Sequence, residues 1–409
     1  MPSSPISVTP ELSRQIQRLA TLAKLSPDKS NKEKKAWVAL LPTARGLRFS
    51  LFEKHRDWHE PAGLPTDFLP ELDPGLGYWV DILQWSQILK GFGRKAELQI
   101  GYQDGGLILE DSQSREKLDL EVNAYPETTL AAPEHPQAVY RLDLRENPEP
   151  TKALHRLGQF VDENPVLPGV LCRSNATGFE WIGGTGNRVA RLQFPATNAS
   201  GRFDMGVFDP SDLERLILAL EADPELTLFC ETGSWTLHSP RLVARFPFQL
   251  RKWPHMGFLE PKGQLEFRTS AKELEAILKA LVAPYESEEL LAYRMEVSKP
   301  DELRFTWAGR NRNALAGEGR LQVDAQDLPV GAAWCIRSDI LKSVQKLLKG
   351  KTWTWNVVEG QTTVLRVTSE AFTCWFCPLL EDPGSPEKPN TDQPPADAES
   401  GAVRAEALL

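Results

Sequence analysis

The feature that most constrains the fold of this 409-residue chain is a long internal repeat. Three stretches share one pattern: an amphipathic helix, a short strand, a turn with a glycine and a returning strand. These stretches are residues 80–109, 208–237 and 336–364, and their turn glycines are Gly105, Gly233 and Gly360. The glycines are 128 and 127 residues apart, a spacing far too long for a solenoid unit. The constant spacing predicts three tandem copies of one domain.

Each copy also begins with a helical pattern of apolar residues. The apolar positions are Leu12, Ile16, Leu19 and Leu22 in the first copy, Leu154, Leu157 and Val161 in the second, and Leu274, Ile277, Leu278 and Leu281 in the third. Spacings of three and four residues place such side chains on one face of a helix. The expected fold class is therefore α+β, with two helices and antiparallel sheets in each copy. The alternative is that helix, strand and hairpin simply recur, as they do in many unrelated α+β proteins.

The repeat also suggests domain boundaries. We predict copies at residues 1–130, 131–248 and 249–381, followed by a disordered tail at residues 382–409. The tail has five prolines, no aromatic residue, and six acidic against two basic residues, so it has little apolar surface to bury. The third copy is the least acidic segment, with a formal charge of +1 against −9 for the whole chain.

The overall composition is that of an ordinary globular protein, with 41% apolar and 25% charged residues. No stretch approaches the roughly 18 consecutive apolar residues of a membrane span, and the first residues lack the basic and apolar regions of a secretion signal. Five cysteines form an odd, sparse set that favours a reducing compartment, so we expect a cytoplasmic protein. The acidic net charge argues against nucleic acid wrapped on the outer surface, while a local basic surface remains compatible with it.

Four short segments resemble one protein family in their order and spacing. They read NPVLPGVL at 164–171, GTGNRVA at 184–190, RFPF at 245–248 and FCPLL at 376–380. Together with the repeat, they resemble the bacterial sliding clamp family, the beta subunit of DNA polymerase III, over residues 6–381. Thr185 and Asn187 replace an aspartate and a histidine of the family pattern, and Leu380 replaces an arginine. The resemblance therefore indicates a divergent member or paralogue.

The resemblance implies a ring-shaped homodimer of head-to-tail chains that encircles duplex DNA and slides along it. Its helices line the inside, where basic side chains contact phosphates without reading the base sequence. The candidates for this DNA-binding lumen are Arg14, Arg18, Lys24, Lys152, Arg156, Lys272, Lys279, Lys342, Lys346 and Lys349. The fourth helix is contrary, since Asp212, Glu214, Glu221 and Asp223 outnumber Arg215. A solvated helix face is the alternative explanation for each basic residue taken singly.

The resemblance also implies a cleft for short peptides of DNA polymerases and clamp loaders. The candidate cleft residues are Leu167, Gly186, Asn187, Arg188, Val189, Pro247, Arg251, Pro378 and Leu379. Core packing is the alternative role for Leu167, Val189 and Pro378. These expectations describe a processivity factor for DNA replication or repair. The alternative function is a clamp-fold adaptor or decoy that binds partner peptides without encircling DNA.

The sequence has no evident catalytic or metal-binding pattern. Cys374 and Cys377 have C-x-x-C spacing, but no second pair of zinc ligands lies at a suitable spacing, so buried thiols are expected. His55 and His59 lack an acidic or cysteine partner motif. We expect no enzyme, no cofactor, no metal and no membrane partner. An enzyme on an unrelated duplicated α+β scaffold is the remaining alternative.

Overall fold

The computed structural model describes residues 5–25, 35–53, 56–92, 97–126, 132–161, 169–250, 264–282, 292–308, 317–325, 328–348, 350–358, 363–370 and 372–379. Predictions that involve Leu167, Arg251, Lys349, Gly360, Leu380 and the tail 382–409 lie outside these residues. Backbone contacts divide the chain into two compact units. The first unit comprises Met1–Thr151, Ala196–Asp204 and Ser211–Gln249, and the second comprises Lys152–Pro195, Met205–Pro210 and Leu250–Leu409. The unit border runs through the predicted second copy, so the three domain boundaries stay predictions.

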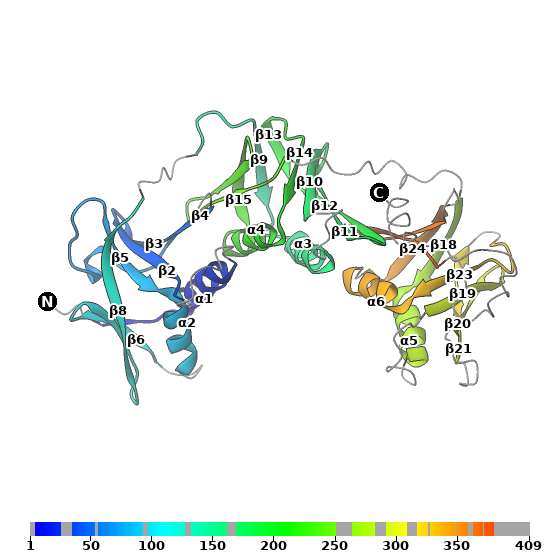
Figure 1. The fold of residues 1–409 in the computed structure, drawn as a ribbon, viewed down its shortest axis with the longest axis horizontal. Helices are drawn as coiled ribbons and strands as arrows, with labels where there is room; N and C mark the ends of the chain where they lie inside the picture. Colours follow the sequence, from blue (N-terminus) through cyan, green and yellow to red (C-terminus); the bar gives the residue numbers. More distant parts are fainter. Residues whose placement is uncertain are drawn as a thin grey trace, which may run out of the picture. The chain divides into compact units, whose positions relative to one another are not determined.

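The described elements follow each other in a regular order (Figure 1). Residues 1–130 form β1 (Ile6–Ser7), α1 (Pro10–Lys24), β2 (Trp37–Thr43), β3 (Gly46–Glu53), β4 (Arg56–Pro61), a short 3-10 helix (Thr66–Phe68), β5 (Leu76–Asp81), α2 (Ile82–Gly91), β6 (Gln99–Gln103), β7 (Gly106–Glu110) and β8 (Arg115–Ala124). Residues 131–248 form β9 (Ala138–Asp143), α3 (Glu149–Phe160), β10 (Val170–Asn175), β11 (Gly178–Thr185), β12 (Arg188–Pro195), β13 (Thr197–Gly201), β14 (Met205–Phe208), α4 (Pro210–Ala222), β15 (Glu225–Glu231), β16 (Ser234–His238) and β17 (Val243–Pro247). Residues 249–381 form β18 (Gln264–Ser270), α5 (Ala271–Val282), β19 (Ala292–Lys299), β20 (Glu302–Ala308), β21 (Glu318–Gln322), β22 (Asp324–Ala325), β23 (Ala333–Arg337), α6 (Ser338–Leu347), β24 (Thr352–Val358), β25 (Val364–Ser369) and β26 (Phe372–Phe376).

This order contains a shorter repeat than the one predicted. Each of the three segments consists of two halves, and each half has a strand, a helix and three further strands, with β13 and β22 as short additions. The predicted pattern of helix, strand, turn and strand corresponds to the later part of every second half. Its turn glycines Gly105 and Gly233 have positive φ angles of 76° and 78°, which glycine adopts without steric cost. The apolar patterns predict the helices of the earlier halves but not their strands as part of the repeat, because these halves are spaced less regularly in the sequence.

The two halves of each segment exchange their first strands. β1 pairs with β6 and β5 pairs with β2 in the first segment. The same exchange joins β9 to β15 and β14 to β10, and then β18 to β24 and β23 to β19. All of these pairs are antiparallel, as the predicted α+β class requires. Each half is thus completed by the other.

Consecutive segments are joined by a different pair of strands. In the first unit β4 pairs with β17, so the described strands of that unit form one sheet with the order β1-β6-β7-β8-β5-β2-β3-β4-β17-β16-β15-β9-β13. In the second unit β12 pairs with β26, within a sheet of order β14-β10-β11-β12-β26-β25-β24-β18-β22. A separate sheet in that unit has the order β21-β20-β19-β23. The last strand of a first half therefore pairs with the last strand of the next segment's second half.

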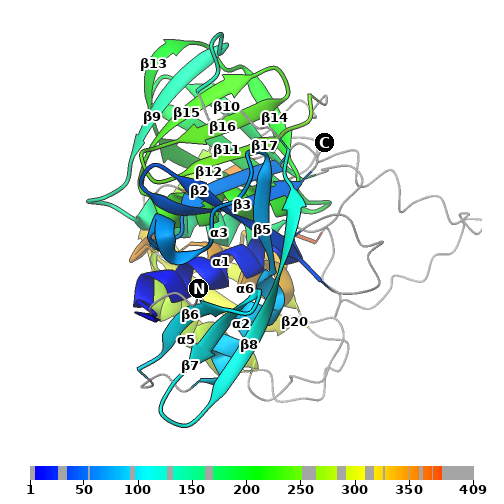
Figure 2. The same ribbon diagram turned by 90° about the vertical axis from the view of Figure 1, so that its left-hand side faces the viewer.

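The helices cover the sheets with their apolar faces. Thr9 caps α1 by accepting a hydrogen bond from the Leu12 amide at 3.1 Å, and Pro10 suits the first turn. The predicted apolar positions Ile16 and Leu19 of this helix are completely buried. α1 packs beside α2, and Figure 2 shows strands β2, β3 and β5 of the same unit above α1. No helix among the described residues is long and apolar enough to span a membrane.

Candidate functional site

The basic residues of α1 divide between the surface and the interior. Arg14 and Lys24 are exposed, and Arg14 forms an ion pair with Glu11 at 3.2 Å. Arg18 instead turns inward, with its Nη2 atom 3.3 Å from Glu60 Oε2 and only 13% of its side chain exposed. The Arg18 guanidinium is thus paired with the buried side chain of Glu60. Arg18 therefore contributes to the interior of the first unit, and we leave it out of the proposed DNA surface.

α3 carries two of the candidate basic residues. Lys152 is exposed, whereas Arg156 is half-buried, with its guanidinium carbon 5.6 Å from the centre of the Phe372 ring. A guanidinium at this distance from an aromatic ring is attracted by the electrons of the ring face. Lys152 is thus the accessible cation of the pair.

The remaining described candidates lie on α5 and α6. Lys272, Lys342 and Lys346 line one cavity in the second unit, together with Lys351 and Glu275. Lys279 lies on α5 but outside the cavity lining, and its Nζ atom is 2.7 Å from Glu275 Oε1. The structure therefore brings three of the predicted lysines together and adds Lys351, which follows α6 in the sequence.

The acidic character of α4 is smaller than its sequence indicates. Asp212 is buried and accepts two hydrogen bonds from Arg56, of 2.7 Å and 2.9 Å. Arg215 is also buried and donates a hydrogen bond to the Leu22 carbonyl. The charges of Asp212 and Arg215 thus belong to the interior of the first unit. Glu221 is the exposed acid of the helix.

The candidate cleft residues of the second unit converge on the pairing of β12 with β26. Arg188, the first residue of β12, lies opposite Phe376, the last residue of β26, so the turn at Gly186 and Asn187 and the chain that continues to Pro378 leave the sheet at the same end. Next to it, the Leu379 amide donates a 2.7 Å hydrogen bond to the Cys335 carbonyl of β23. The hairpin turn before β12 and the chain after β26 are therefore neighbours. Pro247, by contrast, ends β17 in the first unit.

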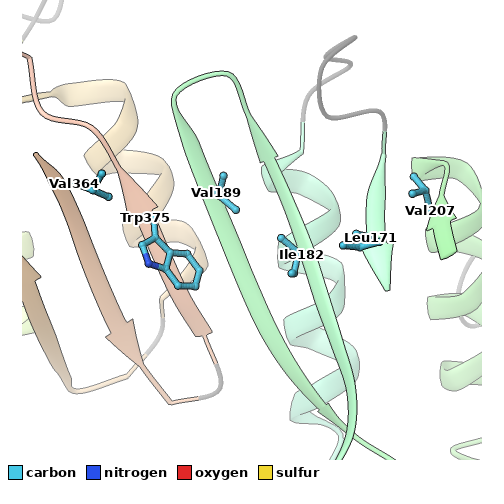
Figure 3. Packing of buried hydrophobic residues seen from close by; sticks show 6 residues of the cluster. All are labelled: Leu171, Ile182, Val189, Val207, Val364 and Trp375. Carbon is cyan, nitrogen blue, oxygen red and sulfur yellow. The ribbon is translucent and has the colours of Figure 1, made fainter. Parts of the chain in front are cut away.

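Two of the candidate cleft side chains have structural partners. Val189 is only 1% exposed and belongs to an apolar cluster with Leu171, Ile182, Val207, Val364 and Trp375. Figure 3 shows this cluster along neighbouring strands, with Val189 beside Trp375. Arg188 donates from Nη1 to Ser343 Oγ at 2.9 Å, and its guanidinium lies 5.0 Å from the Phe160 ring centre. Core packing therefore accounts for Val189. Gly186, Asn187, Pro378 and Leu379 are half-buried, as is Arg188, which also contacts Ser343 and Phe160.

Sequence reasoning missed the partners that orient these residues. Ser343 and Phe160 lie on two helices that are far apart in the sequence, and no motif connects them to Arg188. Trp375 was also not among the candidate site residues. The guanidinium carbon of Arg191 lies 5.0 Å from the centre of the Trp375 ring. Only Lys351 carried a detectable signal, since it extends a run of lysines on α6.

The described residues contain no cluster of three or more metal-ligating side chains. Cys374 and Cys377 are free thiols, the first buried and the second half-buried. Burial raises the pKa of the Cys377 thiol to about 11, so the thiol stays protonated at neutral pH. His59 is buried beside Ser50 Oγ at 3.0 Å, and burial lowers its pKa to about 4. A neutral buried histidine with a hydroxyl partner has a packing role.

Comparison with known proteins connects this geometry to one fold. No family model and no curated protein matches the sequence. Among solved structures, the Helicobacter pylori beta clamp bound to a DNA ligase peptide matches with a TM-score of 0.67 and 11% identity, over 93% of this chain and 100% of the other. The beta subunit of DNA polymerase III from Thermotoga maritima matches with a TM-score of 0.69 and 12% identity, over 93% and 99%. The Pseudomonas aeruginosa sliding clamp bound to griselimycin matches with a TM-score of 0.68 and 12% identity, over 92% and 99%.

The chain has the fold of a bacterial sliding clamp. The resemblance inferred from the short segments is thus confirmed at the level of the fold, and the low identity fits a divergent sequence. The match spans nearly the whole length of both proteins, so no large part of the clamp fold is missing.

Proposed function

We propose that this protein is a DNA sliding clamp without enzymatic activity. Two chains would close head to tail around duplex DNA and hold a DNA polymerase, or another replication or repair protein, on its template. The observation that carries this proposal is the shared fold over 92–93% of this chain and 99–100% of three solved clamps. A closed ring retains its partner by topological linkage, so it needs no tight contact with the bases.

The strand pattern supports closure of two chains. At both junctions within the chain, the last strand of a first half pairs with the last strand of a following second half. Among the described strands, β21 has a neighbour on one edge only, and the Arg115–Asp119 part of β8 likewise pairs only with β7. β21 closes the first half of the third segment, and β8 is the last strand of the second half of the first segment, so they are the two kinds of strand that pair at the junctions within the chain. Pairing β21 with β8 of a second chain would continue the pattern and remove both exposed edges.

The accessible basic residues support sliding on DNA. Arg14, Lys24, Lys152, Lys272 and Lys342 are exposed on helices, where they suit phosphate contacts that ignore base sequence. The residues Gly186, Asn187, Pro378 and Leu379 would form part of a cleft for the peptides of polymerases and clamp loaders. A peptide-bound relative, the Helicobacter pylori clamp with its DNA ligase peptide, supports a peptide partner. Such a protein acts in the cytoplasm, where DNA is replicated.

The test of encirclement is retention on DNA of different topology. Labelled protein is loaded onto nicked circular DNA with the host's clamp loader, and half of the sample is linearised. The proposal expects slow release from circles and rapid loss from linear DNA, at a salt concentration that abolishes simple electrostatic binding. Equal release from both forms contradicts encirclement.

The alternative is a clamp-fold adaptor or decoy that binds partner peptides without encircling DNA. Thr185 and Asn187, which replace an aspartate and a histidine of the family pattern, favour this alternative. Thr185 Oγ1 donates a 3.0 Å hydrogen bond to Asn187 Oδ1, and this bond holds the turn before β12. A monomer that binds peptide, yet shows no difference between circular and linear DNA, would establish this alternative.

A further inference from the structure

The second unit contains a cavity of about 680 Å³ between the start of α5 and the face of α6. Its lining includes four lysines and one acid: Lys272, Lys342, Lys346, Lys351 and Glu275. Volumes of 300–1,000 Å³ are typical of sites for small ligands. The cavity is therefore large enough to hold a ligand and has a strong excess of positive charge.

The positive charge of this cavity is poorly compensated. Glu275 is already paired with Lys279 at 2.7 Å, and among the described residues no ion pair is found for the four cavity lysines. Lys342 and Lys346 are one helical turn apart, about 6 Å along the axis, where like charges repel each other. An anion in the cavity would relieve this repulsion.

The backbone at the start of α5 adds to the positive potential. Ser270, Ala271 and Lys272 line the cavity at the first turn of this 12-residue helix, where the helix dipole favours anions. The Ser270 hydroxyl accepts from the Glu273 amide at 3.4 Å, and the Ala271 amide donates to the Lys351 carbonyl at 2.9 Å. The second bond holds the Lys351 backbone against the start of α5.

Gly350, the residue before Lys351, packs closely against the end of β25. A β-carbon at this position would overlap Ser369 Oγ, so a larger residue would displace this hydroxyl from its hydrogen bond to the Thr352 carbonyl. Beside it, the buried Trp353 lines the cavity wall. The cavity lysines thus lie on α5, on α6 and directly before β24.

The cluster is specific to the third segment of the repeat. At the offset of 127 residues, Lys342 and Lys346 correspond to Arg215 and Ala219 of α4, and both of these side chains are buried. The second segment therefore has no counterpart of this lysine pair, and the concentrated positive charge is a local feature of the third segment.

We propose that this cavity is a binding site for an oligophosphate, meaning two or more linked phosphate groups. Two lysines one turn apart on α6, with Lys272 and Lys351 on the opposite wall, suit several neighbouring phosphates better than a single one. The linked phosphate groups belong either to the backbone of DNA or to a free oligophosphate. Where DNA is the source, the inference rests on the proposed function, whereas binding of a free oligophosphate does not depend on ring closure.

The first arm of the test uses tripolyphosphate and the full-length chain in isothermal titration calorimetry. The parent protein is expected to bind tripolyphosphate saturably, at one site per chain. Lys342→Gln/Lys346→Gln should weaken binding at least about tenfold, because it removes two charged donors. Lys90→Gln, at an exposed lysine in the last turn of α2, is the matched control and should leave the affinity within about twofold. Glu275→Gln should tighten binding, an outcome that misfolding cannot imitate.

The second arm identifies the source of the phosphates with a short duplex DNA. If the DNA backbone occupies the cavity, the double variant should lower the salt dependence of duplex binding by about two phosphate contacts, and tripolyphosphate should compete with DNA. Unchanged duplex binding, with tripolyphosphate binding still lost, assigns the site to a free oligophosphate. Equal affinity of parent and double variant for tripolyphosphate overturns the proposal, as does a loss no larger than that of Lys90→Gln. If the protein binds tripolyphosphate but is released equally from circular and linear DNA, the ring is refuted and the oligophosphate site stands.

Discussion

His59 and Glu60 are neighbours on β4 and are both buried, yet their protonation responds to burial in opposite ways. Burial lowers the pKa of His59 to about 4, with a further contribution from the charge of Arg48. Burial raises the pKa of Glu60 to about 7, although the nearby Arg18 opposes the shift. In both cases loss of hydration disfavours the charged form. One strand therefore carries two groups whose effects on stability have opposite pH dependence.

The raised pKa of Glu60 determines how its contribution to folding stability depends on pH. The pKa of Glu60 rises from 4.5 to about 7 on folding, so its contribution to stability is complete below pH 4.5 and is lost as the pH rises to 7. The contribution of His59 is complete above pH 6.5 and is lost as the pH falls to 4. Between these values the two contributions partly cancel in the parent protein.

Replacing Glu60 by glutamine should isolate one of these contributions. The free energy of unfolding of Glu60→Gln, relative to the parent, should increase from pH 4.5 to pH 7 by an amount on the order of 3 kcal/mol. Urea unfolding at several pH values measures this difference, with Glu71→Gln as the exposed control. A difference that stays constant over this range would show that Glu60 is not shifted by burial.

The buried pair of Arg56 and Asp212 leads to a second prediction at this scale. Their side chains are 14% and 2% exposed, so removing one partner leaves a poorly hydrated charge. Arg56→Met or Asp212→Leu alone should destabilise the protein by about 3–5 kcal/mol, and the double variant by clearly less than the sum. A double-mutant cycle from urea unfolding tests this coupling. Additive effects would mean that the pair contributes nothing beyond its separate side chains.

At the scale of elements, the orientation of backbone groups identifies which strand edges are open. The Leu120 amide donates to the Gly105 carbonyl, so alternation along β8 points the Lys117 amide away from β7. Likewise the Val323 amide donates to the Asp301 carbonyl, so the Arg320 amide of β21 points away from β20. Proline at either position would remove a donor from the open edge and leave the existing ladder intact.

Lys117→Pro and Arg320→Pro should therefore each prevent self-association while the chain stays folded. Light scattering across a concentration series is expected to give about twice the chain mass of 45.8 kDa for the parent and one chain mass for each variant. Lys117→Gln and Arg320→Gln change the same side chains, retain the amide donor, and should stay dimeric. Dimeric proline variants would exclude the β8–β21 pairing, and a monomeric parent would remove the two-chain ring.

Two substitutions near the hairpin before β12 and the chain after β26 should distinguish residues that bind a peptide from residues that pack in the core. Leu379→Asp places a charge at a half-buried cleft position and should weaken a labelled peptide of the cognate DNA polymerase at least about tenfold, with little change in thermal stability. Val189→Ala removes two methyl groups from the buried cluster and should cost about 1–3 kcal/mol of stability instead. Fluorescence anisotropy and thermal unfolding record both quantities. Unaltered peptide affinity in Leu379→Asp would place the peptide elsewhere.

At the scale of the whole molecule, the net charge and the local charges have different signs. The chain carries a formal charge of −9, which discourages indiscriminate binding of nucleic acid, while exposed lysines gather around one cavity of the second unit. Buried pairing removes Arg18 and Asp212 from this balance. Sequence counts alone therefore overstate both the basic character of α1 and the acidic character of α4.

The amino-acid sequence determined the α+β class, the helices and the long repeat, because these depend on side-chain periodicity within short stretches. The positions of α2, α4 and α6 and of the hairpins after them follow from such local patterns. Tertiary structure alone decided the exchange of strands between halves, the inward turn of Arg18, the contact of Arg188 with Ser343 and the gathering of four lysines around one cavity. These features join residues far apart in the chain. Their partners are chosen by packing and by the cost of burying an unpaired polar group, which no local pattern encodes.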